Sequence, residues 1–273
     1  MEKNAIPMSI SRPIRDATSD QSYVYVGVDS SGTGNYFGEF VLPPRAMTGI
    51  VQKLNTNWNV VGTPQAGEGS IRLITEPKGY KTSIRGFCFA WDPFVTPGTP
   101  KLYAVGNTEG YLAFPLASPP DGSARSNMGK EDGFITLIGT NQGDRGLKFI
   151  TTTQIGGIER DEIGACTVEF DGVKKDGMVF TIGTTAGSVP GGRNLGGDDL
   201  FMSRYDLQLN LDYNVQWGTS ANDFSYAPAS SSPASLPGQG VIYAQRRQTG
   251  GGNTSDTATT NTGLVWAAMS QGR

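Results

Sequence analysis

Apolar and polar residues alternate along short segments of the chain, and clusters of Gly, Asn, Asp and Ser separate these segments. The clearest example lies between residues 198 and 232. It predicts one strand over residues 200–205, a second over residues 211–217 and a third that begins at Phe224. Alternation with a period of two, bounded by turn residues, is typical of half-buried strands. No window of about 11 residues carries a helical apolar stripe free of Gly, Pro or β-branched runs, so the sequence predicts an all-β protein.

This pattern recurs along the chain. Segments similar to residues 200–206 occur at residues 49–55, 133–139 and 263–269. The polar corner at residues 218–223 (GTSAND) has counterparts at residues 17–20 and 157–161. An apolar strand follows the corners at residues 22–29, 163–171 and 224–231, and residues 83–92 form the same kind of strand after a longer loop. A further strand then follows at residues 35–41, 102–106, 179–183 and 241–245.

Four strands per unit, at an interval of roughly 60 to 80 residues, predict a β-propeller of four-stranded antiparallel blades. The whole chain, residues 1–273, is then one domain. Its blades are predicted at residues 22–81, 82–161, 162–222 and 223–273, and the last blade also takes the strand at residues 6–14.

Closure of the ring depends on the strand at residues 6–14. Pro7 and Pro13 indicate an edge strand, because proline donates no ladder hydrogen bond. The strand precedes the corner at residues 17–20 as residues 211–217 precede the corner at residues 218–223. We therefore expect it to complete the last blade, which removes open sheet edges. The alternative is that the chain is a segment of a larger propeller.

Composition and charge argue against several classes of protein. The 38 glycines and 16 prolines suit short strands joined by tight turns, and the aromatic content of 10% argues against disorder. A net charge of −3 argues against a nucleic-acid or anionic-membrane partner. No apolar run approaches the roughly 20 residues of a membrane span, and the N-terminus lacks the apolar region of a signal peptide.

Cys88 and Cys166 are expected to be small buried hydrophobic residues. Equivalent positions of neighbouring blades lie too far apart for a disulfide. The cysteines therefore do not indicate whether the protein lies in an oxidising or a reducing compartment.

The chain contains no histidine, which removes Ser-His-Asp and Cys-His sites and His-ligated metals. Two cysteines alone cannot form a structural zinc site. The glycine-rich residues 183–197 are followed by no helix, so they predict a loop instead of a phosphate site. We predict no catalytic, cofactor-binding or metal-binding residue, and no enzyme activity.

Acidic residues are the remaining candidates for chemistry. A glycosidase-like pair at the propeller mouth would draw on Glu169, Asp92, Asp161, Glu162 and Asp171. Their recurrence at the turns of the repeat favours a different role, the capping of turns.

Two calcium sites are also conceivable, but neither has the spacing of a defined calcium loop. Their oxygen ligands would come from Asp198 and Asp199 with Asn194, or from Asn222 with Asp223.

Aromatic residues that alternate along the strands are interpreted as core between blades. They are Tyr23, Tyr25, Phe87, Phe89, Trp91 and Trp217. Asn253 begins one glycosylation sequon, which matters only in a secreted protein.

The repeat resembles the SBBP family of β-propeller repeats. Asp29-Ser30-Ser31-Gly32 matches the turn of that family, and residues 199–206 (DLFMSRYD) match its central strand. Asn210, Trp217, Gly218 and Asp223 match the end of the repeat. The sequence departs from the family after Asp206, where Leu-Gln-Leu-Asn stands in place of a glycine turn. The resemblance implies a propeller fold and an extracellular or cell-surface protein, and it carries over no catalytic residue.

These patterns predict a non-enzymatic structural or interaction propeller whose partners are other protein subunits of an assembly. The alternative is a carbohydrate-binding or glycosidase-like propeller, which would use axial carboxylates and aromatic residues on glycans.

Overall fold

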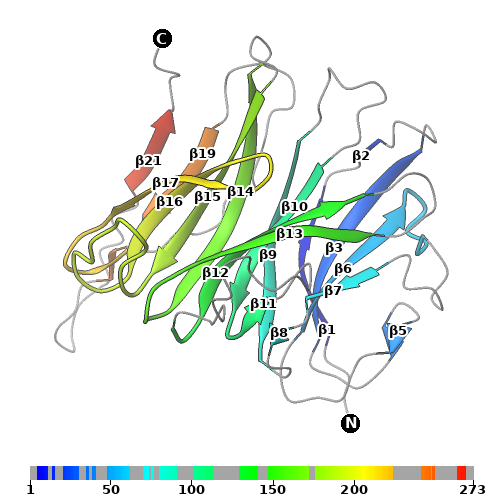
Figure 1. Ribbon diagram of the computed structural model, residues 1–273, viewed down its shortest axis with the longest axis horizontal. Coiled ribbons are helices and arrows are strands. Elements are labelled where there is room, and N and C mark those ends of the chain that lie inside the picture. Colours follow the sequence, from blue (N-terminus) through cyan, green and yellow to red (C-terminus); the bar gives the residue numbers. More distant parts are fainter. Residues whose placement is uncertain are drawn as a thin grey trace.

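The protein is built from β-strands in the part of the chain that the computed structural model describes, and no helix occurs among those residues (Figure 1). The described residues are 5–11, 14–15, 21–30, 35–36, 39–40, 48–61, 70–73, 75–76, 80–90, 101–112, 129–140, 147–171, 176–223, 241–246, 248–249 and 263–268. Every strand pairing in the sheets is antiparallel. The all-β prediction is confirmed.

The second and third sheets are four-stranded meanders, in which neighbouring strands follow one another along the chain, except that β11 lies between β10 and β12 in sequence and pairs elsewhere. The second sheet consists of β9 (Thr82–Ala90), β10 (Lys101–Thr108), β12 (Asp132–Gly139) and β13 (Lys148–Ile155). The third consists of β14 (Asp161–Asp171), β15 (Asp176–Thr185), β16 (Asp199–Asp206) and β17 (Leu211–Trp217). These two sheets span residues 82–155 and 161–217.

The first sheet has the strand order β1 (Ala5–Ile10), β3 (Ser22–Ser30), β6 (Thr48–Asn55) and β7 (Ser70–Arg72), and β2 (Ile14–Arg15) also pairs with β3. β1 lies at the edge, as Pro7 requires, and its register against β3 shifts between Pro7 and Ser9. Its predicted place in the last blade is therefore wrong. β3 is much nearer in sequence, so this pairing closes a far shorter loop.

This pairing makes β3 the second strand of its sheet, whereas residues 22–29 were predicted to be the first. The predicted strand at residues 35–41 is also wrong. β4 (Asn35–Tyr36) and β5 (Glu39–Phe40) instead form a separate two-stranded sheet.

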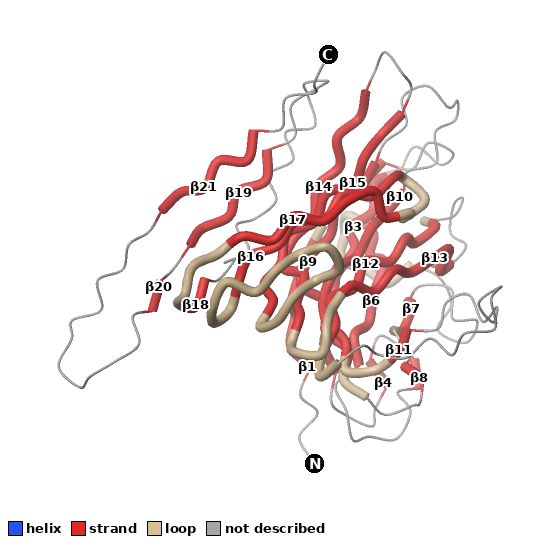
Figure 2. Tube along the Cα trace, turned by 60° about the vertical axis from the view of Figure 1, so that its left-hand side comes forward, coloured by secondary structure: helices blue, strands red, loops and turns tan. Residues whose placement is uncertain are grey.

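Three further strand pairs complete the described structure. β19 (Val241–Arg246) pairs with β21 (Gly263–Ala268), and both lie to one side of the third sheet (Figure 2). β18 (Asn222–Asp223) pairs with β20 (Gln248–Thr249), and β8 (Thr75–Glu76) pairs with β11 (Tyr111–Leu112). The predicted strand at residues 224–231 lies outside the described residues. The described sheets do not join into a closed ring.

The second and third sheets share several local details. In each, the register of the first strand against the second shifts at one position, beside Gly106 or Gly183. A side chain at Gly106 would meet the carbonyl oxygen of Ser83, and one at Gly183 would meet that of Glu162. Each glycine also lies under a phenylalanine ring of the third strand, Phe134 or Phe201 in turn. Glycine is needed because the strands approach closely there.

Hydrophobic layers fill the spaces between successive sheets. One cluster joins the first and second sheets through Tyr25, Val51, Ile84 and Phe134, among others. A second cluster joins the second and third sheets through residues such as Tyr103, Ile135, Phe201 and Tyr205. The predicted core aromatics Tyr23, Tyr25 and Phe87 are buried, and Phe89 and Trp217 are partly buried against the clusters. Trp91 lies outside the described residues.

Cys88 and Cys166 form a disulfide between β9 and β14, so the expectation of two unlinked cysteines is wrong. β9 and β14, the first strands of their sheets, lie side by side, and the two Cα atoms are 5.6 Å apart. By register, the position equivalent to Cys166 in the second sheet is Phe87. The cysteines are therefore offset by one residue, and adjacent first strands are close enough for the bond. Among the described residues, no helix is long and apolar enough to cross a membrane.

Candidate functional site

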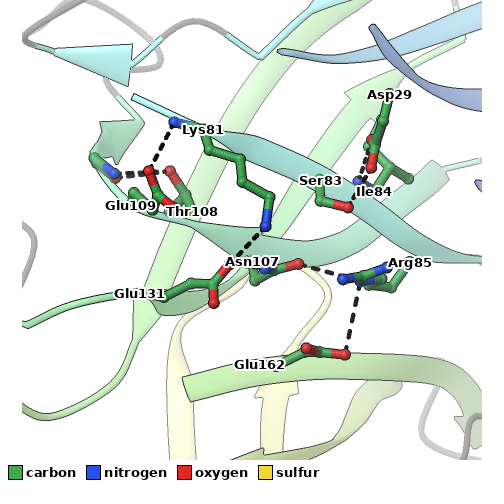
Figure 3. Close-up of polar contacts among 11 residues, drawn as sticks. Asp29, Lys81, Ser83, Ile84, Arg85, Asn107, Thr108, Glu109, Glu131 and Glu162 are labelled. Atoms are coloured by element: carbon green, nitrogen blue, oxygen red, sulfur yellow. Dashed lines mark hydrogen bonds and ion pairs between the residues drawn. The ribbon is translucent and has the colours of Figure 1, made fainter. Parts of the chain in front are cut away.

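A polar cluster lies where the first three sheets meet (Figure 3). We call it the inter-sheet polar cluster, and it comprises Asp29, Lys81, Ser83, Arg85, Asn107, Glu131 and Glu162. β9 supplies Ser83 and Arg85, with Lys81 immediately before it, whereas the other members come from or adjoin β3, β10, β12 and β14. The cluster forms because charged and polar residues occupy the ends of strands that are distant in sequence.

Asn107 is the centre of the exposed part of the cluster, although it is itself buried. Its Oδ1 accepts a hydrogen bond from Nε of Arg85 at 3.2 Å, and its Nδ2 donates to Glu131. Arg85 lies 3.6 Å from the Glu162 carboxylate, and Nζ of Lys81 lies 3.6 Å from Glu131. The side-chain amide of Asn107 thus links two ion pairs. Each pair consists of one cation and one carboxylate, so their charges cancel.

Asp29 is the buried part of the cluster and joins the first sheet to the second. The Ser83 hydroxyl donates to its Oδ2, and the backbone N–H of Ile84 donates to its Oδ1 at 3.1 Å. Burial raises the pKa of Asp29, and these two hydrogen bonds partly oppose that rise. Because the carboxylate is held by donors of β9, its role is to position the first sheet.

The corners that follow the second and third sheets share one structure. The backbone N–H of Gly157 donates to Oδ2 of Asp161 at 2.7 Å, and that of Thr219 donates to Oδ2 of Asp223 at 2.6 Å. The N–H of each aspartate in turn donates to the carbonyl oxygen of the residue before the sheet's third strand, at 2.6 Å in both corners. The predicted turn-capping role is confirmed for Asp161, and the structure gives the same role to Asp223, which was predicted only as a candidate calcium ligand and as the end of the repeat.

A second aspartate completes each corner. Nε2 of Gln154 donates to Asp132 at 3.4 Å, and Nε2 of Gln216 donates to Asp199 at 2.9 Å. A side chain at Gly156 would meet Asp132, and one at Gly218 would meet Asp199. The sequences QIGGIERD and QWGTSAND therefore encode the same motif.

Asp161 differs in its electrostatics. Burial raises the pKa of Asp161 to about 6, against hydrogen bonds from Thr185 and Gly157. The nearby charges of Asp132 and Glu159 raise it further.

Most of the candidate calcium ligands are engaged by donors of the protein, whereas the buried Oδ1 of Asp199 has no hydrogen-bond partner among the described residues. Asp198 pairs with Arg160 at 3.1 Å, and Asp199 accepts hydrogen bonds from Gln216 and the backbone of Leu195. The Asn194 side chain donates to the carbonyl oxygen of Ala186 and accepts from the N–H of Gly196. Asn222 accepts a hydrogen bond from the backbone of Asp198 at 3.0 Å. Within the described residues, no group of three or more acidic or cysteine side chains could hold a metal.

The structure gives different roles to the acidic residues that were predicted as a glycosidase-like set. Asp161 caps a corner, whereas the neighbouring Glu162 belongs to the inter-sheet polar cluster. Asp92, Asn253 and the side chains of Glu169 and Asp171 lie outside the described residues. Sequence reasoning missed Lys81, Arg85, Asn107 and Glu131. A signal was present for Lys81, Asn107 and Glu131, since they are polar residues at or beside the ends of otherwise apolar strands, whereas Arg85 lies within β9.

The loops beside the cluster expose apolar side chains. Ile158 is 79% exposed, Leu195 is 47% exposed and Tyr80 is 46% exposed. The loops of Ile158 and Leu195 are held together by the ion pair between Arg160 and Asp198. This end of the sheets therefore combines paired charges with unburied apolar groups.

Comparison with known proteins identifies no family. No family model matches the chain, and no curated protein matches it. Among solved structures, the chain is similar to a crystal structure of an N-acetylgalactosamine deacetylase from F. plautii in complex with blood group B trisaccharide. The two chains are 12% identical with a TM-score of 0.39, and the match covers 97% of this chain and 71% of the other. A likeness at this level carries no argument about this chain.

Proposed function

We propose that the chain is a β-propeller of four-stranded blades that acts as a non-enzymatic interaction module in a protein assembly. The repeated glycine, register shift and capped corner of successive sheets support the propeller. They also fit the resemblance to SBBP repeats. The disulfide between Cys88 and Cys166 supports an extracellular or cell-surface location, because such bonds persist in oxidising compartments.

One observation carries the interaction role. At the loop end, the polar side chains are engaged with one another, whereas large apolar side chains face solvent. Ile158, on the loop of a rigid capped corner, is the most exposed of them. Apolar side chains presented on a rigid scaffold are typical of protein-binding surfaces.

Sedimentation velocity over a wide concentration range, together with native purification from the cells that make the protein, tests the proposal. A stoichiometric protein complex is expected from at least one of the two measurements. Ile158→Asp is expected to weaken a complex formed at the loop end, with Gln208→Asp as an exposed control on a different turn. A chain that stays free in both measurements contradicts the interaction role.

A second candidate function, carbohydrate binding, is favoured by the partial exposure of the cluster. The side chains of Arg85 and Glu162 are 29% and 36% exposed, and Asn107 and Glu131 lie beside them. Planar polar groups of this kind can bind sugar hydroxyls. A glycan array distinguishes the candidates. Binding that is lost in Glu131→Gln and in Arg85→Gln would favour the carbohydrate, and a blank array would favour the protein partner.

A further inference from the structure

We propose that Lys81 and Asn107 form an intramolecular isopeptide bond, which makes the inter-sheet polar cluster a site of covalent modification. The amine of Lys81 attacks the side-chain amide carbon of Asn107, and the amide nitrogen leaves as ammonia. Glu131 transfers the protons, and Arg85 stabilises the amide oxygen during the attack. The reaction goes beyond the proposed function, because it joins two side chains of one chain and needs neither a partner nor a cofactor.

The register of the second sheet brings the two side chains to one place. Asn107 lies on β10, the strand between β9 and β12, and it pairs with Ser83 of β9. The same ladder continues to Lys81, whose carbonyl oxygen accepts a hydrogen bond from the N–H of Glu109 at 2.9 Å. Lys81 is therefore the diagonal neighbour of Asn107 on one face of the sheet, within the reach of a long side chain.

Glu131 holds the amine and the amide at a single atom. It immediately precedes β12, on the other side of β10 from Lys81. Its Oε1 accepts a hydrogen bond from Nδ2 of Asn107, and the same Oε1 lies 3.6 Å from Nζ of Lys81. Figure 3 shows the amine of Lys81 directed toward Glu131 and Asn107. Because both nitrogens lie at one oxygen, only a small movement of the lysine side chain separates Nζ from the amide carbon.

The amide of Asn107 is held in the orientation that the attack needs. Nε of Arg85 donates to its Oδ1 at 3.2 Å, so a guanidinium group stands where negative charge develops on that oxygen. Its Nδ2 faces the carboxyl group that returns a proton to it. Asn107 is 1% exposed and the side chain of Glu131 is 14% exposed, so water has little access to compete with the amine.

The reaction balances in atoms and in charge. Glu131 takes a proton from the ammonium group of Lys81, and the neutral amine forms a bond to Cγ of Asn107. The Cγ–Nδ2 bond then breaks, and its electron pair stays with the departing nitrogen. Glu131 moves two protons in turn from the lysine nitrogen to this nitrogen, which leaves as ammonium. The products are one secondary amide and one ammonium ion, and no oxidant or reductant is consumed.

The product preserves the other contacts of the cluster. The amide oxygen of Asn107 stays beside Arg85, and the N–H of the new amide takes the place of Nδ2 as a donor to Glu131. The bond ties the segment that enters the second sheet to β10 and closes a covalent loop that contains β9. Cys88 lies in this loop, so the bond and the disulfide would together link β9, β10 and β14 covalently.

Intact-mass spectrometry of the purified full chain, after reduction of the disulfide, tests the proposal. Wild type is expected to be lighter than the mass of its sequence by one ammonia. Lys81→Arg keeps the positive charge but has no amine, so it should have the full mass of its sequence. Lys101→Arg, at the far end of β10, is the matched control and should lose ammonia as wild type does. Tryptic digestion of wild type should give one branched peptide that joins Lys81 to Asn107.

Glu131→Gln distinguishes proton transfer from simple proximity. This variant should form the bond at least about 100-fold more slowly than wild type, and bond formation at the wild-type rate overturns the role of Glu131. Wild type at the full mass of its sequence overturns the bond itself. A loss of ammonia that persists in Lys81→Arg also overturns it, because the ammonia then comes from a different reaction, such as cyclisation of an asparagine. A cooperative thermal transition in each variant shows that a full mass reflects a missing bond and not a failure to fold.

Discussion

The boundary between the second and third sheets is held differently from the boundary beyond the third sheet. The former has the Cys88–Cys166 disulfide, the ion pair between Arg85 and Glu162 and a hydrogen bond from the Thr153 hydroxyl to the carbonyl oxygen of Leu209. At the latter, the chain passes through the same kind of capped corner, but Val215 remains half exposed. Phe180, Ile182 and Met202 are nevertheless buried in an apolar cluster on this face. The same repeated frame can thus hold a boundary with a covalent bond or without one, depending on the side chains placed in it.

The corners capped by Asp161 and Asp223 differ in the donors that their carboxylates accept. Asp223 accepts hydrogen bonds from both the backbone N–H and the hydroxyl of Thr219, at 2.6 and 2.9 Å. The equivalent of Thr219 is Gly157, so Asp161 has no hydroxyl donor from that position and has Asp132 nearby. Burial and the charges of Asp132 and Glu159 raise the pKa of Asp161 in its corner.

Removal of the disulfide should have the largest effect on this comparison. The bond closes a loop of 78 residues, and Cys88→Ser with Cys166→Ser should lower the free energy of unfolding by about 4 kcal/mol. Urea denaturation of the double variant against wild type measures this. An unchanged midpoint under oxidising conditions would mean that the bond does not hold the boundary.

Removal of the aspartate side chains that cap the two corners should have the next largest effect. The loss of unfolding free energy should differ between the two variants. Asp223→Ala should lower the free energy of unfolding by about 3 kcal/mol at pH 7, since it leaves two donors without a partner. Asp161→Ala also leaves two donors without a partner, at Gly157 and Thr185, but it should cost only about 1 to 2 kcal/mol, because it removes a carboxylate whose charged form is disfavoured by burial and by Asp132. Urea denaturation of both variants checks the order, and a larger loss from Asp161→Ala would contradict the account.

The raised pKa of Asp161 predicts a pH dependence of defined sign. The folded protein binds the proton up to about pH 6, whereas the unfolded chain releases it near the usual value of 3.8. The free energy of unfolding should therefore fall as pH rises from about 4 to about 6, and this contribution should be constant above that range.

Asp161→Asn should remove this part of the pH dependence, which thermal denaturation at several pH values will show. The matched variant is Asp223→Asn, in which the fall between about pH 4 and 6 should persist. Titration of the Asp161 carboxyl by NMR should give a midpoint near 6. A midpoint near 4 would contradict its burial beside Asp132.

The ion pair of the inter-sheet polar cluster should contribute least. Arg85→Gln and Glu162→Gln are each expected to change the free energy of unfolding by less than about 1 kcal/mol, because both side chains are about a third exposed. A double-mutant cycle by urea denaturation gives the coupling. A coupling well above 1 kcal/mol would mean that the cluster locks the sheets as firmly as the caps do.

Local patterns predicted most strands of the second and third sheets, although no strand was predicted at residues 148–155, where β13 lies. Residues 133–139, 200–205 and 211–217 were placed correctly because alternation and turn residues act within a few positions. The corner motif also came from sequence, since Gly218 and Asp223 stand at a fixed spacing and form a local cap.

Contacts between distant segments could not be predicted in this way. The partner of β1 depends on a choice between strands that look alike in sequence, and Pro7 indicates only that it lies at an edge. The disulfide depends on a one-residue offset between two first strands. Likewise, Asn107 joins Arg85 to Glu131 only because three strands end at one place.

The disulfide also decides how the molecule responds to tension. β10, β12 and β13 lie entirely within the covalent loop between Cys88 and Cys166. When the chain is pulled from its ends, the force bypasses these strands, and roughly 270 Å of extended chain stays stored in the 78-residue loop. The chain of the second sheet can therefore extend under force only after the disulfide has been reduced.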